Sequence, residues 1–540
     1  SVYNSLSAYP KDTAIIASDG IIQGYHVVTI AYYPIIYIPG NRELYIRDLS
    51  VTLNYRTSFT ATTSPNISYN RALLAKGYVK AMVENPEDVD RYADNSNVIP
   101  QKVSLNKGQS AANTRGINIM EEIIPDYIII TRDSLKDTYK KLADWKTKTG
   151  IPTLIKTLEE IEVDYRGSDL PEKIRNYLLD VKKRWNGNSM FVLLGGDTDV
   201  VPARLAYGYK EHSNYTADIY YVADSVSWNP STYNLSSNSD TVFQSSSYIG
   251  RLPLKTIKET CTFINKLLTY EKANDKNVDY SYFENSLIVA SFLNGPKDTS
   301  GTYINEIFNH CLNRGNNYWY MFDHFKCTST NDHIYKQTYD YSDATKGEEL
   351  NKNNFLSALQ NGRNYGQFHF VYHLDHSWQS HLGASAKTKG MYIFNKDIDD
   401  LPDTFYPKVI LSSGCHPGRV DKDCIAEHLF KKTHGGAVAF LGNTDVGWAE
   451  EHFQLKEFLD IALKKDVSSK EQYSLGYIHS KTSKKYTPYW RFHLLGDPTT
   501  LMWTSTPKNL QVTVTPSSIN SGENEITVTV KNLPTGQQAT

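Results

Sequence analysis

Hydrophobic and polar residues follow two different rhythms along this chain. Residues 1–120 contain short alternating segments such as Gly24–Ile30, Ile35–Ile38 and Leu49–Tyr55, separated by polar or Gly/Pro turns. Helical periodicity is weak there and is confined to the region of Tyr69–Glu84. Alternation with a period of two is typical of strands that bury one face. An N-terminal β-sandwich-like domain is therefore predicted.

After residue 120, apolar strands alternate with segments of helical length. Buried-type strands are predicted near Asp126–Thr131, Thr153–Ile155 and Met190–Leu194, with helices at Leu135–Thr149 and Pro171–Trp185. This order predicts βαβ units and a parallel-rich sheet covered by helices on both faces. The same rhythm returns later in the strands Ser286–Ser291, Gln367–Val371, Val409–Ser412 and Ala437–Leu441, and in the helices Thr256–Glu271, Tyr303–Asn313, Cys424–Lys432 and Leu455–Lys464.

Four regions are predicted from these rhythms. An N-terminal β domain (1–120) ends in a turn-rich linker or processing site, Lys107–Gly116. Two α/β regions (121–275 and 276–503) join near Lys272–Glu284, and their strands form either two sub-sheets or one long sheet. The last region (504–540) has two alternating strands, and about 35 residues cannot bury a stable core alone. It is either the start of an immunoglobulin-like β domain or a segment that packs on its neighbour.

Composition excludes several classes of function. The net charge is −2 and no Lys/Arg run stands out, so no nucleic-acid partner is expected. No stretch of 18 apolar residues is present, so no membrane span is expected. The five cysteines have no CxxC spacing, which argues against zinc-ribbon and thioredoxin sites, and Cys261, Cys311 and Cys424 lie in helix-like patterns that assign them to packing. The 39 tyrosines, with abundant Asn, Ser and Thr, favour a secreted or cell-surface bacterial protein.

Two segments each consist of an apolar strand followed by a polar turn, and they contain the candidate catalytic residues. Phe370–His381 (FVYHLDHSWQSH) places His376 just past a strand end, and Val409–Glu427 does the same for Cys415. The carboxyl ends of neighbouring strands in an open α/β sheet are where ligands bind. A thiol and an imidazole brought together there are the minimum parts for nucleophilic acyl transfer. The sequence therefore favours a cysteine peptidase that acts on protein or peptide substrates.

These segments resemble the gingipain family of cysteine peptidases, the C25 group of the caspase-like clan. Its members carry a histidine in a turn after a strand, and a Cys nucleophile followed downstream by a Cys-Phe-Ala-Glu helix start. The matching residues here are Asp375-His376-Ser377, Gly414-Cys415 and Cys424–Glu427. Further matches occur in the family's order at Phe191–Pro202, Ala217–Tyr220, Tyr248–Leu252, Gly436–Trp448 and Leu494–Leu501. The resemblance implies a caspase/gingipain-like α/β fold, and an N-terminal region similar to the family's pro-domain, hence a zymogen.

The resemblance also assigns roles to single residues. His376 is similar to the family's general base and Cys415 to its nucleophile, with the N–H groups of Cys415 and Ser377 as the oxyanion hole. Trp448 falls where the family places a tryptophan of the S1 pocket. No cofactor is implied for the chemistry. Structural calcium is implied, and the loop carboxylates suited to it are Asp197, Asp199 and Asp218.

The chain departs from the family pattern at three places, and each departure limits which residue roles the resemblance implies. The glycines that flank the family's histidine are Asp375 and Ser377 here. The family's third catalytic carboxylate is missing: Leu293 or Asn294 stands in its place, and an asparagine can orient an imidazole. The acidic residue behind arginine specificity has no clear match, although Asp298 is a possible substitute, so basic specificity is not inherited.

Three alternative functions stay open from the sequence. A zinc-dependent hydrolase is suggested by the nearby His369, His373, Asp375, His376 and His381. A catalytically inactive surface or adhesion protein on a peptidase scaffold is suggested by the lost carboxylate. A sortase-like transpeptidase of the same family would use the same thioester and differ only in the acceptor.

Overall fold

The structure is a computed structural model of the whole chain. It describes residues 5–22, 25–46, 67–68, 76, 79–80, 82–92, 98–99, 125–185, 189–208, 213–224, 228–229, 234–235, 245–291, 293, 317–322, 346–385, 391–447, 453–464, 473–482, 491–516 and 527–532.

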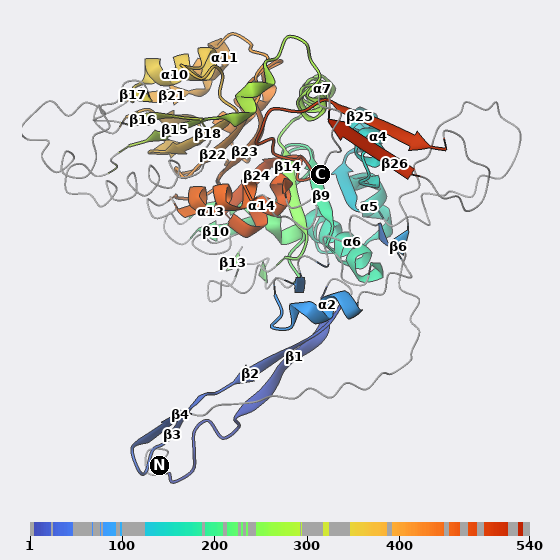
Figure 1. Cartoon of the computed structure of the whole chain (residues 1–540), viewed down its shortest axis with the longest axis vertical. Coiled ribbons are helices and arrows are strands. Elements are labelled where there is room, and N and C mark those ends of the chain that lie inside the picture. The colour runs from blue at the N-terminus through green and yellow to red at the C-terminus, as the bar shows by residue number, and fades with distance from the viewer. Residues whose placement is uncertain are drawn as a thin grey trace, which may run out of the picture.

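One sheet of eleven strands organises the main body (Figure 1). Its order is β17-β16-β15-β18-β22-β23-β24-β14-β9-β7-β8, so the strands of both predicted α/β regions belong to one continuous sheet. The alternative of two separate sub-sheets is wrong. The strands are β7 (Tyr127–Thr131), β8 (Thr153–Thr157), β9 (Phe191–Gly195), β14 (Tyr248–Leu252), β15 (Asn285–Ala290), β16 (Asn317–Phe322), β17 (Gly347–Glu349), β18 (Phe370–Leu374), β22 (Lys408–Ser412), β23 (Ala437–Asn443) and β24 (Phe492–Gly496).

The sheet is mostly parallel. From β17 to β23 every neighbouring pair is parallel, β23 and β24 pair antiparallel, and β14, β9, β7 and β8 are parallel with one another. All residues of β7, β9, β15, β18, β22 and β23 are buried, as expected for strands covered on both faces. This is why those strands stood out in the sequence as continuous apolar runs.

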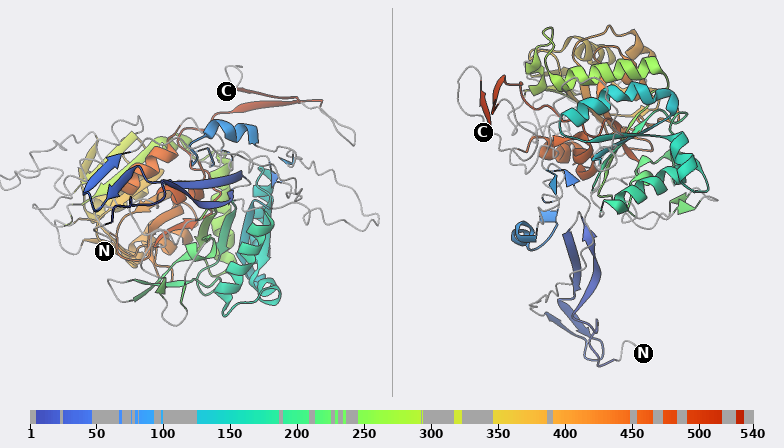
Figure 2. Two further views of the ribbon diagram at one scale, coloured as in Figure 1. Left: turned by 90° about the horizontal axis from the view of Figure 1, so that it is seen from below. Right: turned by 90° about the vertical axis from the view of Figure 1, so that its right-hand side faces the viewer.

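Helices cover both faces of the sheet (Figure 2). In β7, Tyr127 and Ile129 belong to one apolar cluster while Ile128 and Ile130 belong to the other, because successive side chains of a strand point to opposite faces. The longer helices are α4 (Asp133–Lys148), α6 (Leu170–Arg184), α7 (Ile257–Lys272), α10 (Lys352–Asn361), α13 (Phe453–Ala462) and α14 (Leu475–Thr482), and the shorter ones are α2 (Pro86–Tyr92), α5 (Leu158–Asp164), α11 (Asn395–Asp400) and α12 (Ile425–Lys431). The predicted α/β architecture is confirmed.

Small antiparallel pieces are attached to this body. A three-stranded sheet next to the end of β18 contains β19 (Ser377–Trp378), β20 (His381–Gly383) and β21 (Tyr392–Phe394). Two-stranded pairs form from β10 (Leu205–Gly208) with β11 (Ser213–Thr216), and from β12 (Trp228–Asn229) with β13 (Asn234–Leu235).

The N-terminal region does not confirm a β-sandwich. Its described strands form the hairpins β1 (Ala14–Ile22) with β2 (Tyr25–Tyr32) and β3 (Ile35–Ile38) with β4 (Glu43–Ile46), and the short parallel pair β5 (Ile67–Ser68) with β6 (Val98–Ile99). The hairpins extend away from the sheet-bearing body (Figure 1). The predicted strand at 49–55 and the predicted linker at 107–116 lie outside the described residues.

The C-terminal region contains the two predicted strands, β25 (Leu510–Thr515) and β26 (Thr527–Asn532), paired antiparallel. Every residue of β25 is exposed, and an immunoglobulin-like domain is not confirmed. Within the part of the chain that is described, no helix combines the length and the apolar character needed to cross a bilayer.

Candidate active site

The two predicted reactive residues follow neighbouring parallel strands. β18 and β22 pair along their length, with His373 opposite Ser412 at the last position. His376 comes two residues after β18 and Cys415 comes three residues after β22. Because parallel strands end at the same edge of a sheet, both residues lie at one rim. The predicted adjacency of the two strands is confirmed.

A hydrogen bond holds the two loops against each other. The hydroxyl of Ser377 donates to the backbone carbonyl oxygen of Cys415 at 2.7 Å. Residue 414 must be glycine at this contact, since a Cβ there would lie 2.1 Å from Ser377 Oγ and 2.8 Å from the carbonyl oxygen of Asp375. The Gly-Cys pair therefore brings the cysteine loop against the turn that carries His376.

The imidazole of His376 is oriented by a backbone carbonyl. His376 is exposed, and its Nε2 lies 3.2 Å from the carbonyl oxygen of Leu293. A carbonyl oxygen can only accept, so Nε2 carries the proton and Nδ1 keeps its lone pair. Leu293 follows β15, the neighbour of β18 on the side away from β22. This orienting group has no side-chain signature, which is why the sequence left the third position open.

Cys415 is half-buried in a turn beyond β22. Its thiol donates to the carbonyl oxygen of Gly447 at 3.6 Å. Gly447 also lies close to this turn, because a Cβ there would be 2.3 Å from the carbonyl oxygen of Ser413. The thiol is thus held between the β22 loop and the segment after β23.

The backbone N–H of Ser377, predicted as part of the oxyanion hole, is directed away from β20. Gly383 N–H donates to the carbonyl oxygen of His376 at 2.6 Å, and Ser377 stands opposite Leu382 in the next position of the ladder. In an antiparallel pair, hydrogen-bonded and non-hydrogen-bonded positions alternate. Ser377 therefore occupies a non-hydrogen-bonded position, and its N–H points out of the hairpin.

His416, next to the cysteine, is engaged away from the thiol. Its Nδ1–H donates to the carbonyl oxygen of Thr444 at 3.1 Å, and its backbone has φ of +61°, a left-handed conformation that is uncommon outside glycine. Its ring stacks on Tyr215 and meets the edge of Trp378 at 4.3 Å between centroids. Trp378 is 37% exposed and had not been singled out from the sequence. It places an apolar surface beside the cysteine turn.

His373 and His369 are packing residues. His373 is fully buried, with Nδ1 2.9 Å from Ser412 Oγ and Nε2 3.0 Å from the carbonyl oxygen of Gly383, and burial lowers its pKa to about 4. His369 lies 2.9 Å from the hydroxyl of Tyr270, and burial lowers its pKa to about 3. Both rings are neutral hydrogen-bonding partners of the protein itself. Among the described residues, no group of three His, Cys, Asp or Glu side chains could hold a metal ion, so the zinc alternative is not supported.

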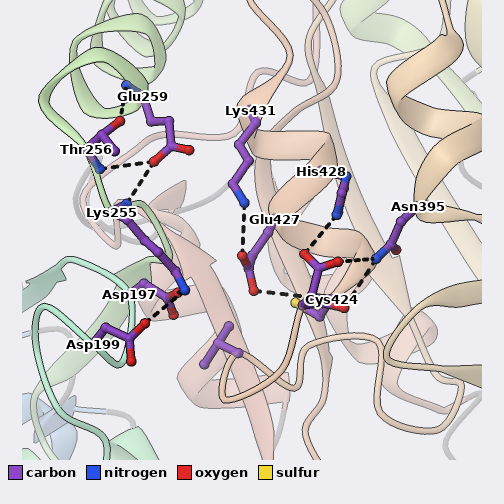
Figure 3. Close-up of polar contacts among 12 residues, drawn as sticks. Asp197, Asp199, Lys255, Thr256, Glu259, Asn395, Cys424, Glu427, His428 and Lys431 are labelled. Atoms are coloured by element: carbon purple, nitrogen blue, oxygen red, sulfur yellow. Dashed lines mark hydrogen bonds and ion pairs between the residues drawn. The ribbon is translucent and has the colours of Figure 1, made fainter.

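The remaining cysteines have different environments. Cys424 is fully buried at the start of α12, burial raises its pKa, and its backbone N–H donates to Glu427 Oε1 at 3.4 Å (Figure 3). Its predicted packing role is confirmed. Cys261 lies on α7 as the helical pattern predicted, but it is exposed, so its assignment to packing is wrong. Cys311 and Cys327 lie outside the described residues.

The carboxylates predicted to bind calcium are paired with cations of the protein. Asp218 accepts two hydrogen bonds of 2.7 Å from the buried guanidinium of Arg251. Asp197 and Asp199 each lie 3.0 Å from Lys255 Nζ (Figure 3). Both oxygens of Asp218 are bound by Arg251, so this carboxylate does not fit a calcium site, whereas Asp197 and Asp199 each give one oxygen to the same lysine. Sequence shows where carboxylates occur but not which cation they meet. Calcium binding stays a prediction.

Three further predicted residues, Asn294, Asp298 and Trp448, lie outside the described part of the chain. Their assigned roles as orienting amide, specificity residue and S1 wall therefore stay predictions.

Comparisons with known proteins agree with the geometry of this site. The model of peptidase family C25 matches residues 121–503. The crystal structure of the Arg specific cysteine proteinase gingipain R (RgpB) is similar with a TM-score of 0.57 and 18% identity, over 75% of this chain and 84% of that one. The complex of Porphyromonas gingivalis RgpB pro- and mature domains gives a TM-score of 0.56 and 17% identity, over 75% and 86%. No curated protein sequence matches the chain. At these identities the structural likeness establishes the fold.

Proposed function

The chain belongs to peptidase family C25 and is a cysteine peptidase, and from that premise we propose that it cleaves proteins through a covalent thioester between substrate and Cys415. The observation that carries this proposal is the contact between the loops after β18 and β22, in which Ser377 Oγ donates to the carbonyl oxygen of Cys415. This contact brings the histidine turn and the cysteine turn together at one rim of the sheet.

The first half of the reaction forms the thioester. Nδ1 of His376 takes the thiol proton, and the thiolate attacks the carbonyl carbon of the scissile peptide bond. The oxyanion that develops is stabilised by backbone N–H groups, of which that of Ser377 points out of its hairpin. The C–N bond then breaks, and the proton on Nδ1 passes to the leaving amine.

The second half releases the product. Water attacks the thioester carbonyl and gives its proton to Nδ1 of His376, a second oxyanion forms, and the C–S bond breaks. The carboxylic acid leaves and the thiol is restored. Through both halves Nε2–H donates to Leu293, which keeps the ring in the tautomer that the chemistry needs.

Substitution of the thiol tests this function. We expect Cys415→Ala to abolish cleavage of an unfolded protein substrate, because Cys415 is the described thiol whose turn contacts the turn of His376. Cys261→Ala is the matched control, since Cys261 is a free and exposed cysteine on α7. Full proteolysis by Cys415→Ala would exclude the proposed nucleophile.

Two alternatives predict different products. A transpeptidase would transfer the acyl group to an added amine in preference to water, so mass spectrometry of the products with and without a peptide amine separates transfer from hydrolysis. An inactive scaffold would show neither product. The tautomer set by Leu293 leaves a basic nitrogen on His376, which favours an active enzyme over that alternative.

We further propose that the region before residue 121 is a removable pro-segment of a secreted enzyme. The family match begins at residue 121, five residues after the end of the predicted processing site. The composition rich in Tyr, Asn, Ser and Thr supports secretion. N-terminal sequencing of active material from the culture medium tests both points. Equal activity of full-length and trimmed protein would contradict the zymogen proposal.

A further inference from the structure

A buried carboxylate lies directly under the histidine turn. Asp375 is 3% exposed, its Oδ1 accepts the backbone N–H of His376 at 2.6 Å, and its Oδ2 accepts the hydroxyl of Ser291 at 2.6 Å. The gingipain pattern has glycine at this position, so the carboxylate is a property of this chain. A buried charged group is expensive unless hydrogen bonds compensate it, and both oxygens of Asp375 are compensated.

The carboxylate and the imidazole are anchored on the same segment. Ser291, which donates to Asp375, and Leu293, which accepts from His376, both follow β15. The backbone N–H of Ser291 in turn donates to the carbonyl oxygen of Leu374 at 2.9 Å. Asp375 therefore fixes the distance between the end of β15 and the turn that carries His376.

The hairpin after His376 is built around this carboxylate. A Cβ on Gly383 would lie 2.5 Å from Asp375 Cγ and 2.7 Å from Oδ2. Glycine at 383 thus leaves room for the carboxylate while its own N–H binds the carbonyl oxygen of His376. The segment before β21 also takes part, since the backbone N–H of Ser385 favours the ionised carboxylate.

Burial raises the pKa of Asp375 to about 6, against the opposing hydrogen bonds of Ser291, His376 and Ser385 and the charge of His376. His376 is the titratable group that acts on this carboxylate. The acid therefore ionises within the pH range in which cysteine peptidases work. In its ionised form it attracts the imidazolium that forms when Cys415 gives up its proton.

We propose that Asp375 is a positioning residue that holds the turn of His376 and, when ionised, stabilises the imidazolium of the thiolate–imidazolium pair. This role rests on the proposed function of Cys415 and His376, and it supplies electrostatically what the missing family carboxylate would supply. Asp375 acts through His376 and is not itself a group that touches substrate.

The pH dependence of Asp375→Asn tests the proposal in the full chain. We expect kcat/KM at pH 8 to fall about 10–100-fold, mostly in kcat, as is usual when an orienting partner is lost. The ratio of wild-type to variant activity should shrink toward one as the pH drops below about 6, because protonated Asp375 resembles an amide. Asp164→Asn, an exposed carboxylate on α5, is the matched control. A pH-independent ratio, or unchanged activity, would overturn the proposal.

Ser291→Ala provides a second variant that leaves the carboxylate in place. Loss of the donor raises the pKa of Asp375, so the acid limb of the activity profile should move to higher pH, and this shift should vanish in the Asp375→Asn background. An unmoved acid limb would contradict the proposal.

Failure of this inference can be told apart from failure of the proposed function. If Cys415→Ala retains proteolysis, the proposed function falls. If proteolysis requires Cys415 but the ratio for Asp375→Asn stays flat with pH, only the inference about Asp375 falls. Alkylation of Cys415 by iodoacetamide, measured on the Cys415 peptide of wild type and Asp375→Asn at several pH values, gives a second comparison. Slower labelling of Asp375→Asn above about pH 6 supports the inference. Equal labelling of the two proteins there opposes it.

Discussion

The hydroxyl of Ser377 donates to the backbone carbonyl oxygen of Cys415 at 2.7 Å, and this bond joins the turns after two adjacent parallel strands. Ser377 directly follows His376, so the bond sets the spacing between the imidazole and the thiol. The neighbouring Gly414 makes the approach possible, since its missing side chain leaves room for Ser377. The arrangement of the site therefore depends on a backbone contact as much as on the two reactive side chains.

Gly414→Ala should separate the two turns. The added methyl group would meet Ser377 Oγ at 2.1 Å and the carbonyl oxygen of Asp375 at 2.8 Å, so we expect a loss of about 1–3 kcal/mol in stability and of most activity. Thermal denaturation and peptide cleavage measure the two effects. Adding Ser377→Gly removes the nearer clash and should restore part of both. Wild-type activity in Gly414→Ala alone would show that the turns are not in close contact.

His376→Ala should remove the general base. We expect kcat to fall about 10²–10⁴-fold with KM little changed, because the ring acts on protons and not on substrate binding. His434→Ala, which removes an exposed histidine, is the control and should cleave normally. Steady-state kinetics on one peptide substrate give both constants. A fall in stability that accounts for the whole loss would remove the support for a catalytic role.

Asn294→Ala distinguishes between two orienting groups. The sequence suggested the amide of Asn294, whereas the structure places the carbonyl oxygen of Leu293 on Nε2 of His376. Because a backbone carbonyl survives side-chain truncation, we expect Asn294→Ala and Leu293→Ala each to keep kcat near the wild-type value. A selective loss of kcat in Asn294→Ala would assign the orienting role to the amide instead.

Glu427→Gln should change how stability depends on pH. Burial raises the pKa of Glu427 to about 7 from an ordinary value of 4.5, and the charge of Asp197 is the next largest cause of this increase. The folded protein therefore favours the protonated carboxyl group of Glu427. The stabilisation that this group contributes is fully present below about pH 4.5 and is lost as the pH rises through about 7. The glutamine keeps an oxygen for the N–H of Cys424 and does not ionise.

We expect the stability of Glu427→Gln relative to wild type to improve by roughly 1–3 kcal/mol between pH 5 and pH 8. Chemical denaturation at several pH values measures the change. Glu162→Gln, at an exposed position of α5, should show no such trend. A parallel pH dependence of wild type and Glu427→Gln would contradict the raised pKa.

Much of the fold could be predicted because buried parallel strands are apolar along their whole length. β22 and β23 stood out in this way, and the polar turns after β18 and β22 marked His376 and Cys415 as neighbours. The short strand β17, with the sequence GEE, has no apolar pattern and could not be recognised.

The parts that sequence could not predict depend on contacts between distant segments. The carbonyl oxygen of Leu293 has no residue type that announces it. Asp218 looks like a metal ligand until Arg251, 33 residues further along, is seen to bind both of its oxygens. Cys261 and Cys424 both fall in helical patterns, yet only the packing of α7 and α12 shows that one is exposed and the other buried.

The rate at which iodoacetamide alkylates Cys415, compared with Cys261 in the same molecule, tests the central claim most directly. Neither thiol is in a disulfide, one lies in the proposed site and the other is exposed on α7, and peptide mass spectrometry follows them separately. At pH 6.5 the paired thiolate should react at least about tenfold faster at Cys415, and His376→Ala should remove this difference. Equal labelling of the two cysteines, unchanged by His376→Ala, would contradict the pairing of thiol and imidazole.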